Sequence, residues 1–146
     1  MSSGSELRTR PLDAKPARTR MLLFVYGTLC RGEPNHRVLG KARFVAHVRT
    51  APFYDLVDLG HFPALLEGGS TAVHGELYEV DESWVGHVDA FEDVPVLYDR
   101  KPVRLEGRAA IGYVMRPEVA GAAPRIASGD WRRHASRQQP QAFATD

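Results

Sequence analysis

The sequence predicts an α+β domain of mostly antiparallel strands with one main helix, covering about residues 21–132. Three observations support this prediction. Apolar and polar residues alternate over 71–80, apolar residues recur every three or four positions over 84–91, and two strand-like runs flank Gly107. A chain of 146 residues is long enough for one domain with a real core and too short for two comfortable ones.

The first strand is expected over the apolar run 21–25, which leads into Tyr26 and stops at Gly27. Gly27 can adopt a positive φ and has no Cβ. Consecutive N–H groups of Gly27, Thr28 and Leu29 could therefore point into one concavity and hold an anion or a carbonyl oxygen. An ordinary strand end is the alternative, because one glycine after a strand is weak punctuation.

The middle of the chain predicts further strands. A short helical turn over 35–39, closed by Gly40, follows the first strand. Partial alternation over 42–57 predicts one long or bent strand, interrupted near Pro52, and hence a curved sheet or barrel. Next come a loop over 60–63, a short strand over 64–66, a turn over 68–70 and the strand over 71–80.

The main helix is expected to begin after Asp81, a good N-cap residue, and to end near Glu92 or Asp93, before Pro95. Its apolar stripe consists of Trp84, Val85, Val88 and Phe91. The stripe predicts that one face of the helix packs on the sheet.

Two strands joined across Gly107 are expected over 96–105 and 109–115. Trp131 is the last large anchor, and residues 133–146 are expected to form a polar C-terminal tail. Residues 1–20 hold five basic side chains and only two leucines, which predicts a disordered basic leader.

The overall charge of the chain does not indicate any particular class of binding partner. The chain has 19 basic and 18 acidic residues, for a net charge of +1, so nothing indicates a nucleic acid or an anionic membrane. A basic face could be formed by Arg100, Lys101, Arg104 and Arg108. Because side chains alternate along a strand, a solvated surface is favoured over a binding face. No run approaches the roughly 18 apolar residues of a membrane span, so we expect a soluble protein.

Metal and thiol chemistry receive little support. Cys30 is the single cysteine, which rules out an internal disulfide and fits a reducing compartment, so the cytoplasm is the expected location. It follows the Gly27 turn, but without a histidine nearby in sequence it is expected to be a small packing residue rather than a nucleophile. The six histidines stand singly, and we expect no metal site.

Glu92 is the candidate for acid/base chemistry. A carboxylate at the negative end of a helix, flanked by Asp93 and close to apolar residues, has its ionised form disfavoured. That condition tunes a glutamate toward neutral pH. A solvated glutamate at a helix end is the alternative.

Several stretches together resemble one family, the gamma-glutamylcyclotransferase-like or AIG2-like proteins, which include the gamma-glutamylamine cyclotransferases. The resemblance runs along the domain in four stretches. They are Val25 to Leu29, Asp58 to Gly60 with Phe62 to Ala64, Val73 to Val80, and Phe91 to Pro95 with Tyr98 and Arg100.

The resemblance implies a small mixed, mostly antiparallel β-barrel with flanking helices. It also implies that the turn formed by Tyr26, Gly27, Thr28 and Leu29 holds a γ-glutamyl group, and that Glu92 is the acid/base. The implied reaction is attack of the substrate's own α-amine on its γ-carbonyl, which releases 5-oxoproline and a free amine without a metal or organic cofactor. The resemblance indicates neither the leaving amine nor the oligomeric state.

Two residues depart from the family pattern, which often has Ser at Thr28 and Gly at Asp93. The first change keeps the hydroxyl group and the N–H. The second adds a carboxylate that either raises the pKa of Glu92 or faces water. A non-catalytic binding module of the same fold is the alternative function, because fold alone does not fix activity.

Overall fold

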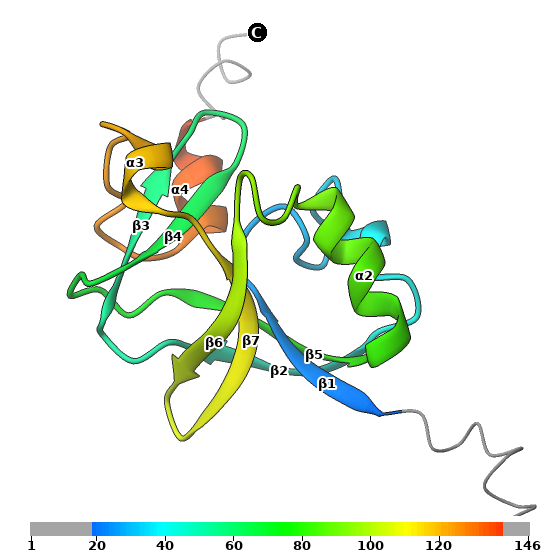
Figure 1. The fold of residues 1–146 in the computed structure, drawn as a ribbon. Helices are drawn as coiled ribbons and strands as arrows, with labels where there is room; N and C mark the ends of the chain where they lie inside the picture. The colour runs from blue at the N-terminus through cyan, green and yellow to red at the C-terminus, as the bar shows by residue number, and fades with distance from the viewer. Residues whose placement is uncertain (1–18, 139–146) are drawn as a thin grey trace, which may run out of the picture.

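The fold is built on a seven-stranded mixed sheet, seen in a computed structural model that describes residues 19–138 (Figure 1). The strands are β1 Arg20–Val25, β2 Arg43–Arg49, β3 Tyr54–Asp58, β4 Pro63–Glu67, β5 His74–Asp81, β6 Asp99–Leu105 and β7 Arg108–Val114. The helices are the 3₁₀ turn η2 His36–Leu39, then α2 Glu82–Phe91, α3 Pro117–Ala120 and α4 Trp131–Gln138.

Most strand pairs are antiparallel, in agreement with the sequence. The strand order is β2-β5-β1-β7-β4-β3, with β6 paired to β7. Two pairs are parallel: Leu23 of β1 lies opposite Ile111 of β7, and Leu65 of β4 lies opposite Val114 of β7. Strand β7 therefore joins the two halves of the sheet.

The expected closed barrel is not confirmed, because the sheet formed by the described residues is open and ends at β2 and β3. The residue after β2, Thr50, meets Leu105 at the end of β6 in an isolated bridge rather than in a continuous ladder. The long strand expected over 42–57 is two strands, since β2 pairs with β5 and β3 pairs with β4. The change of pairing partner, from β5 to β4, occurs around Pro52. Proline has no N–H to donate to a strand ladder.

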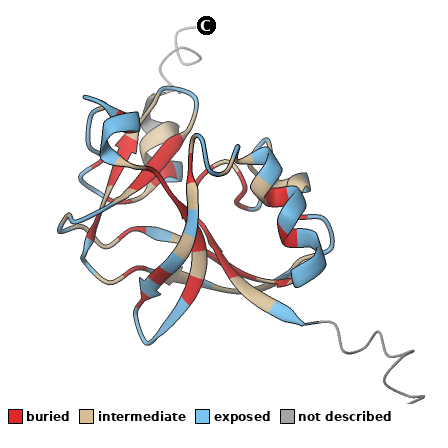
Figure 2. Cartoon of the chain, viewed as in Figure 1, coloured by how far each residue is buried: buried red, intermediate tan, exposed pale blue. Residues whose placement is uncertain are grey.

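Residues 21–25 of β1 form an unbroken apolar run, as expected of a strand covered on both faces. Leu23 and Val25 pack in one core cluster with Val85 and Val88 of α2. Phe24 and the buried Leu77 and Trp131 belong to a second cluster on the other face. Buried residues accordingly concentrate in the central strands and on the sheet-facing side of α2 (Figure 2).

The predicted stripe of α2 is only half buried. Val85 and Val88 face the core, whereas Trp84 is 38% exposed and Phe91 is 45% exposed. Trp84 lies against Gly40 and donates a 3.0 Å hydrogen bond from its indole N–H to the main-chain oxygen of Val38. Trp84 therefore connects α2 to η2 and does not contribute to the core.

Regular secondary structure extends beyond residues 21–132 at both ends. Strand β1 starts at Arg20, and residues 1–18 of the predicted leader lie outside the described residues. Helix α4 continues to Gln138, through part of the predicted tail, and His134 on it contacts Asp58 at 2.8 Å. Residues 139–146 lie outside the described residues. Over residues 19–138, none of the helices has the length and apolar character that crossing a membrane requires.

Candidate active site

The turn after β1 and the C-terminal end of α2 line one cavity of about 240 Å³. Every site residue expected from the sequence contributes to its wall, namely Tyr26, Gly27, Thr28, Leu29 and Glu92. The wall also includes Asn35, His61, Phe62, Pro63, Phe91, Tyr98 and Tyr113. The fold therefore brings together two stretches that are far apart in the chain.

Among the described residues, the turn at Gly27, Thr28 and Leu29 has its carbonyl groups hydrogen-bonded within the protein, whereas its N–H groups are not. The three carbonyl oxygens accept hydrogen bonds from Cys30 N (3.0 Å), Asn35 N (3.0 Å) and His36 Nδ1 (2.9 Å) respectively. A carbonyl can only accept, so Nδ1 of His36 carries the proton. Within residues 19–138, no acceptor is found for the N–H groups of Gly27, Thr28 and Leu29. These N–H groups are available to a ligand.

Gly27 is needed for a different reason from the one expected. It is not among the residues with positive φ. A Cβ at Gly27 would lie 2.6 Å from Cγ and 2.8 Å from Cδ of Pro63, closer than packed carbon atoms approach. Glycine is therefore required for the close approach of β4, and the expectation of a left-handed conformation was wrong.

The phenol of Tyr26 is already used inside the protein. Its hydroxyl donates to the main-chain oxygen of Tyr113 at 2.8 Å and accepts from Leu65 N at 3.1 Å. Burial raises the pKa of Tyr26 well above its usual value. Tyr26 thus contributes its ring to the cavity wall, while its hydroxyl links β1 to β7 and β4.

Glu92 is held by a regular helix ending. It is the C-cap of α2, and its N–H donates to Val88 O at 2.9 Å. Asp93 N donates to Ala90 O and Val94 N donates to Asp89 O, each at 3.1 Å, which is the hydrogen-bond pattern of a Schellman motif. Asp93 has φ 56, the left-handed conformation that this motif requires and that Gly adopts most easily.

Burial raises the pKa of Glu92 to about 7 from the ordinary 4.5. Asp93 is exposed and does not contribute to this shift, so its carboxylate faces water. A half-buried carboxyl with a pKa near neutrality can both accept and donate a proton at physiological pH.

Among the wall residues that the sequence analysis did not name as site residues, three make side-chain hydrogen bonds. Asn35 donates from Nδ2 to the Thr28 hydroxyl at 3.1 Å, and so fixes that side chain. Tyr98 donates to Pro63 O at 3.0 Å, and Tyr113 donates to Asp89 Oδ1 at 2.8 Å. Tyr98 carried a signal in the family resemblance, whereas nothing in the local sequence marks Asn35.

A family model described as gamma-glutamyl cyclotransferase, AIG2-like, matches residues 23–133. The chain belongs to this family. The match covers both the turn after β1 and Glu92, so the AIG2-like region includes the whole cavity described above.

Two relatives and one solved structure show the extent of the similarity. The chain is 43% identical over 110 residues to a putative gamma-glutamylcyclotransferase of Vibrio cholerae, which covers 75% of this chain and 94% of that protein. It is 47% identical over 94 residues to human gamma-glutamylaminecyclotransferase, covering 58% of this chain and 61% of the human protein. The crystal structure of a mouse AIG2-like protein superimposes with a TM-score of 0.63 at 33% identity, covering 76% of this chain and 88% of the mouse chain.

Cys30 is not a wall residue of the AIG2-like cavity. It is buried, and its thiol contacts the main-chain oxygen of Val25 at 3.6 Å. Burial raises the pKa of Cys30, which disfavours the thiolate that a nucleophile needs. No group of three or more potential metal ligands gathers within residues 19–138.

Proposed function

We propose that this AIG2-like chain is a gamma-glutamylcyclotransferase, which converts a γ-glutamyl amine or amide into 5-oxoproline and a free amine. One observation supports this most strongly. Glu92, with a pKa of about 7, lines the same cavity as a turn whose three N–H groups have no acceptor among the described residues. Family membership adds the reaction type.

The N–H groups of Gly27, Thr28 and Leu29 bind oxygen atoms of the γ-glutamyl group in this proposal, as backbone nests bind anions and oxyanions. A cavity of about 240 Å³ suits this group alone. Pockets for drug-sized ligands measure roughly 300–1,000 Å³. The leaving amine then lies at the mouth, where the wall residues His61 and Phe91 are exposed.

The chemistry needs one proton carrier and no enzyme nucleophile. The α-amine nitrogen attacks the γ-carbonyl carbon, which forms the ring C–N bond, and ionised Glu92 accepts a proton from that nitrogen. The amide C–N bond then breaks while Glu92 returns the proton to the leaving nitrogen. Tethered attack of this kind can reach effective molarities of about 10⁵ M or more, so folding the substrate is a large part of the catalysis.

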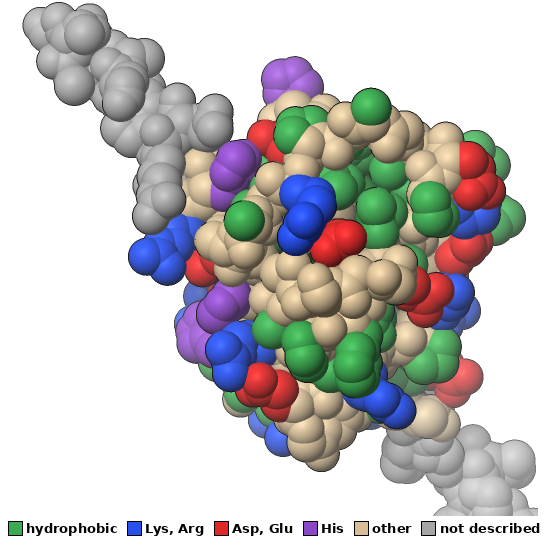
Figure 3. Space-filling model, turned by 90° about the vertical axis from the view of Figure 1, so that its left-hand side faces the viewer, with side chains coloured by type: hydrophobic (Ala, Val, Ile, Leu, Met, Phe, Trp, Pro, Cys, Tyr) green, Lys and Arg blue, Asp and Glu red, His purple; other side chains and the backbone are tan. Residues whose placement is uncertain are grey.

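The proposed partner is a small molecule, without a nucleic acid. Two of the basic residues on β6 are paired with acids: Arg100 contacts Asp89 at 3.0 Å and Lys101 contacts Glu67 at 2.8 Å. On the face that carries α3 and α4, basic and acidic side chains are interspersed (Figure 3). We place the reaction in the cytoplasm, where an unpaired thiol such as that of Cys30 stays reduced.

A product screen tests the proposal. The protein is incubated with γ-glutamyl amines, γ-glutamyl dipeptides and glutathione, and 5-oxoproline is measured. Release of 5-oxoproline from at least one of them is expected. A protein that binds these ligands and forms no 5-oxoproline is a binding module, and that result contradicts the proposal.

A further inference from the structure

We propose that Glu76 and Arg132 form a positioning pair that holds residues 27–35 in their ligand-binding shape from the side opposite the cavity. The inference rests on the proposed function, because it assigns a role within the same site. Neither residue lines the cavity of Glu92.

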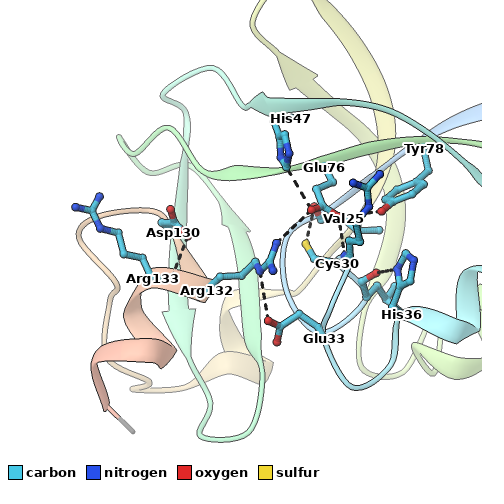
Figure 4. A network of polar contacts seen from close by, with 12 residues as sticks. Val25, Cys30, Glu33, His36, His47, Glu76, Tyr78, Asp130, Arg132 and Arg133 are labelled. Atoms are coloured by element: carbon cyan, nitrogen blue, oxygen red, sulfur yellow. Dashed lines mark hydrogen bonds and ion pairs between the residues drawn. The ribbon is translucent and has the colours of Figure 1, made fainter. Parts of the chain in front are cut away.

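Glu76 is a buried acid at the centre of a polar network. Its side chain lies in β5 and the residue is 2% exposed. Oε1 accepts hydrogen bonds from Arg31 N at 2.8 Å and from the Tyr78 hydroxyl at 3.0 Å. Oε2 accepts from Arg132 Nη1 at 3.2 Å. Figure 4 shows Tyr78 of β5, His47 of β2 and Arg132 of α4 around Glu76.

Arg132 joins two carboxylates that belong to different segments. Besides Glu76, its Nε donates to Glu33 Oε2 at 3.3 Å, and Glu33 lies in the loop after the turn. Figure 4 shows Arg132 reaching from α4 toward both acids. Trp131, the preceding residue, is buried in the core and fixes the start of α4. The backbone of Arg132 is therefore fixed beside the loop, and its guanidinium group reaches both carboxylates from there.

These contacts act on the ligand-binding turn through the backbone. Glu76 holds the N–H of Arg31, two residues after Leu29, and Arg31 also lies over the Phe44 ring at 4.1 Å. The segment returns at Asn35, whose main-chain and side-chain nitrogens both donate to Thr28. The pair thus fixes the loop that sets where the N–H groups of Thr28 and Leu29 point.

The polar network of Glu76 and Arg132 lies at a different cavity from that of Glu92. Glu76, Arg132 and Cys30 line a second cavity of about 440 Å³, and Tyr26 lines both cavities. Glu92 and α2 make none of the hydrogen bonds described for this network. Loss of the pair should consequently weaken substrate binding and spare the proton transfer by Glu92.

The test compares Arg132→Gln and Glu76→Gln with Arg133→Gln as the matched control. Arg133 is the next residue on α4, lines the same second cavity, and contacts Asp130 through its main-chain N–H, which the substitution keeps. Steady-state release of 5-oxoproline gives kcat and KM. Amide hydrogen exchange over residues 28–35 reports the loop directly, without turnover.

For Arg132→Gln we expect KM to rise by about fivefold or more with kcat within about threefold, and faster exchange over 28–35. Arg133→Gln should match the wild type in all three measurements. The double variant with Glu76→Gln should lose less than the sum of the single variants, because both remove one pair. Since Arg132 is partly exposed, its variant decides the question if Glu76→Gln does not fold.

A folded Arg132→Gln with the KM and loop exchange of the wild type overturns the inference. So does a fall in kcat with unchanged KM, which would indicate a disturbed acid/base group instead. If the wild type itself releases no 5-oxoproline, the proposed function fails, and exchange over 28–35 still tests the positioning pair independently.

Discussion

Tyr26 donates a hydrogen bond of 2.8 Å from its hydroxyl to the main-chain oxygen of Tyr113. The bond joins the end of β1 to β7 directly beside the cavity. A tyrosine that the sequence placed in the binding turn therefore has its polar atom committed to the fold, and this gives its substitution a distinct outcome.

Tyr26→Phe should lower stability and leave substrate affinity nearly unchanged. It leaves the buried oxygen of Tyr113 and the N–H of Leu65 without their partner, at a cost of about 1–3 kcal/mol. Urea unfolding and KM are the measurements, with Tyr54→Phe as a control buried tyrosine outside the cavity wall. Wild-type stability combined with a large rise in KM would show that the hydroxyl contacts substrate instead.

Glu92→Gln should separate binding from turnover. Gln keeps the shape of the side chain but cannot accept the proton, so kcat should fall by roughly 10² to 10⁴ while a γ-glutamyl ligand still binds. Glu82→Gln, at the exposed other end of α2, is the matched control and should retain full activity. Wild-type turnover by folded Glu92→Gln would rule out the proposed mechanism.

The pH dependence of kcat/KM should have an acid limb near pH 7. Glu92 must be ionised to accept the proton, and burial raises its pKa to about 7, so the rate falls as the pH drops below that value. Asp93→Gly should leave the limb in place, because the exposed Asp93 does not contribute to the shift and Gly suits φ 56. Movement of the limb to lower pH in Asp93→Gly would mean that the neighbouring charge, rather than burial, sets the pKa.

Glu92 should also make the protein less stable as the pH rises. Between 4.5 and about 7, the native state binds more protons at Glu92 than the unfolded chain does, so the free energy of unfolding falls with pH across this window. The Glu92→Gln variant has no carboxyl group at this position, so its free energy of unfolding does not fall for this reason. Urea unfolding on both sides of the window should show the variant gaining on the wild type as the pH increases, and a constant difference would contradict the expectation.

Gly27→Ala should disturb the cavity although Ala is a small residue. The new Cβ would lie 2.6 Å from Cγ of Pro63, so β4 must move, at a cost of about 1–3 kcal/mol. Stability should fall and KM should rise, because Pro63 also lines the cavity. Gly86→Ala is the control: nothing lies within 4 Å of a Cβ on this exposed residue of α2, so stability should rise by up to about 1 kcal/mol. Wild-type stability and KM in Gly27→Ala would show that β4 yields without cost.

The sequence predicted the features that depend on residues close together in the chain. The apolar run of β1 and its stop at Gly27, and the end of α2 at Glu92, are the two features that make the cavity, and each is visible in a window of a few residues. The hairpin across Gly107 is another such feature.

Features that depend on distant partners escaped prediction. The reason for Gly27 is Pro63, and the role of Asn35 arises only because its loop returns to Thr28. Alternation over 42–57 indicated extended chain but not the change of partner between β2 and β3, and the barrel that it suggested is not confirmed. Helix α4 is mostly polar and is anchored by Trp131, which leaves a weak apolar pattern.

The late position of β7 in the sequence determines when the site can form during folding. Its parallel pairs, Leu23 with Ile111 and Leu65 with Val114, join segments that no tight turn can connect, and such distant pairings form slowly. During translation, a chain that has emerged through Glu92 already carries the binding turn and the carboxyl group. It still lacks β7, the strand that pairs with both β1 and β4, so we expect the cavity to form only once residues 108–114 are present.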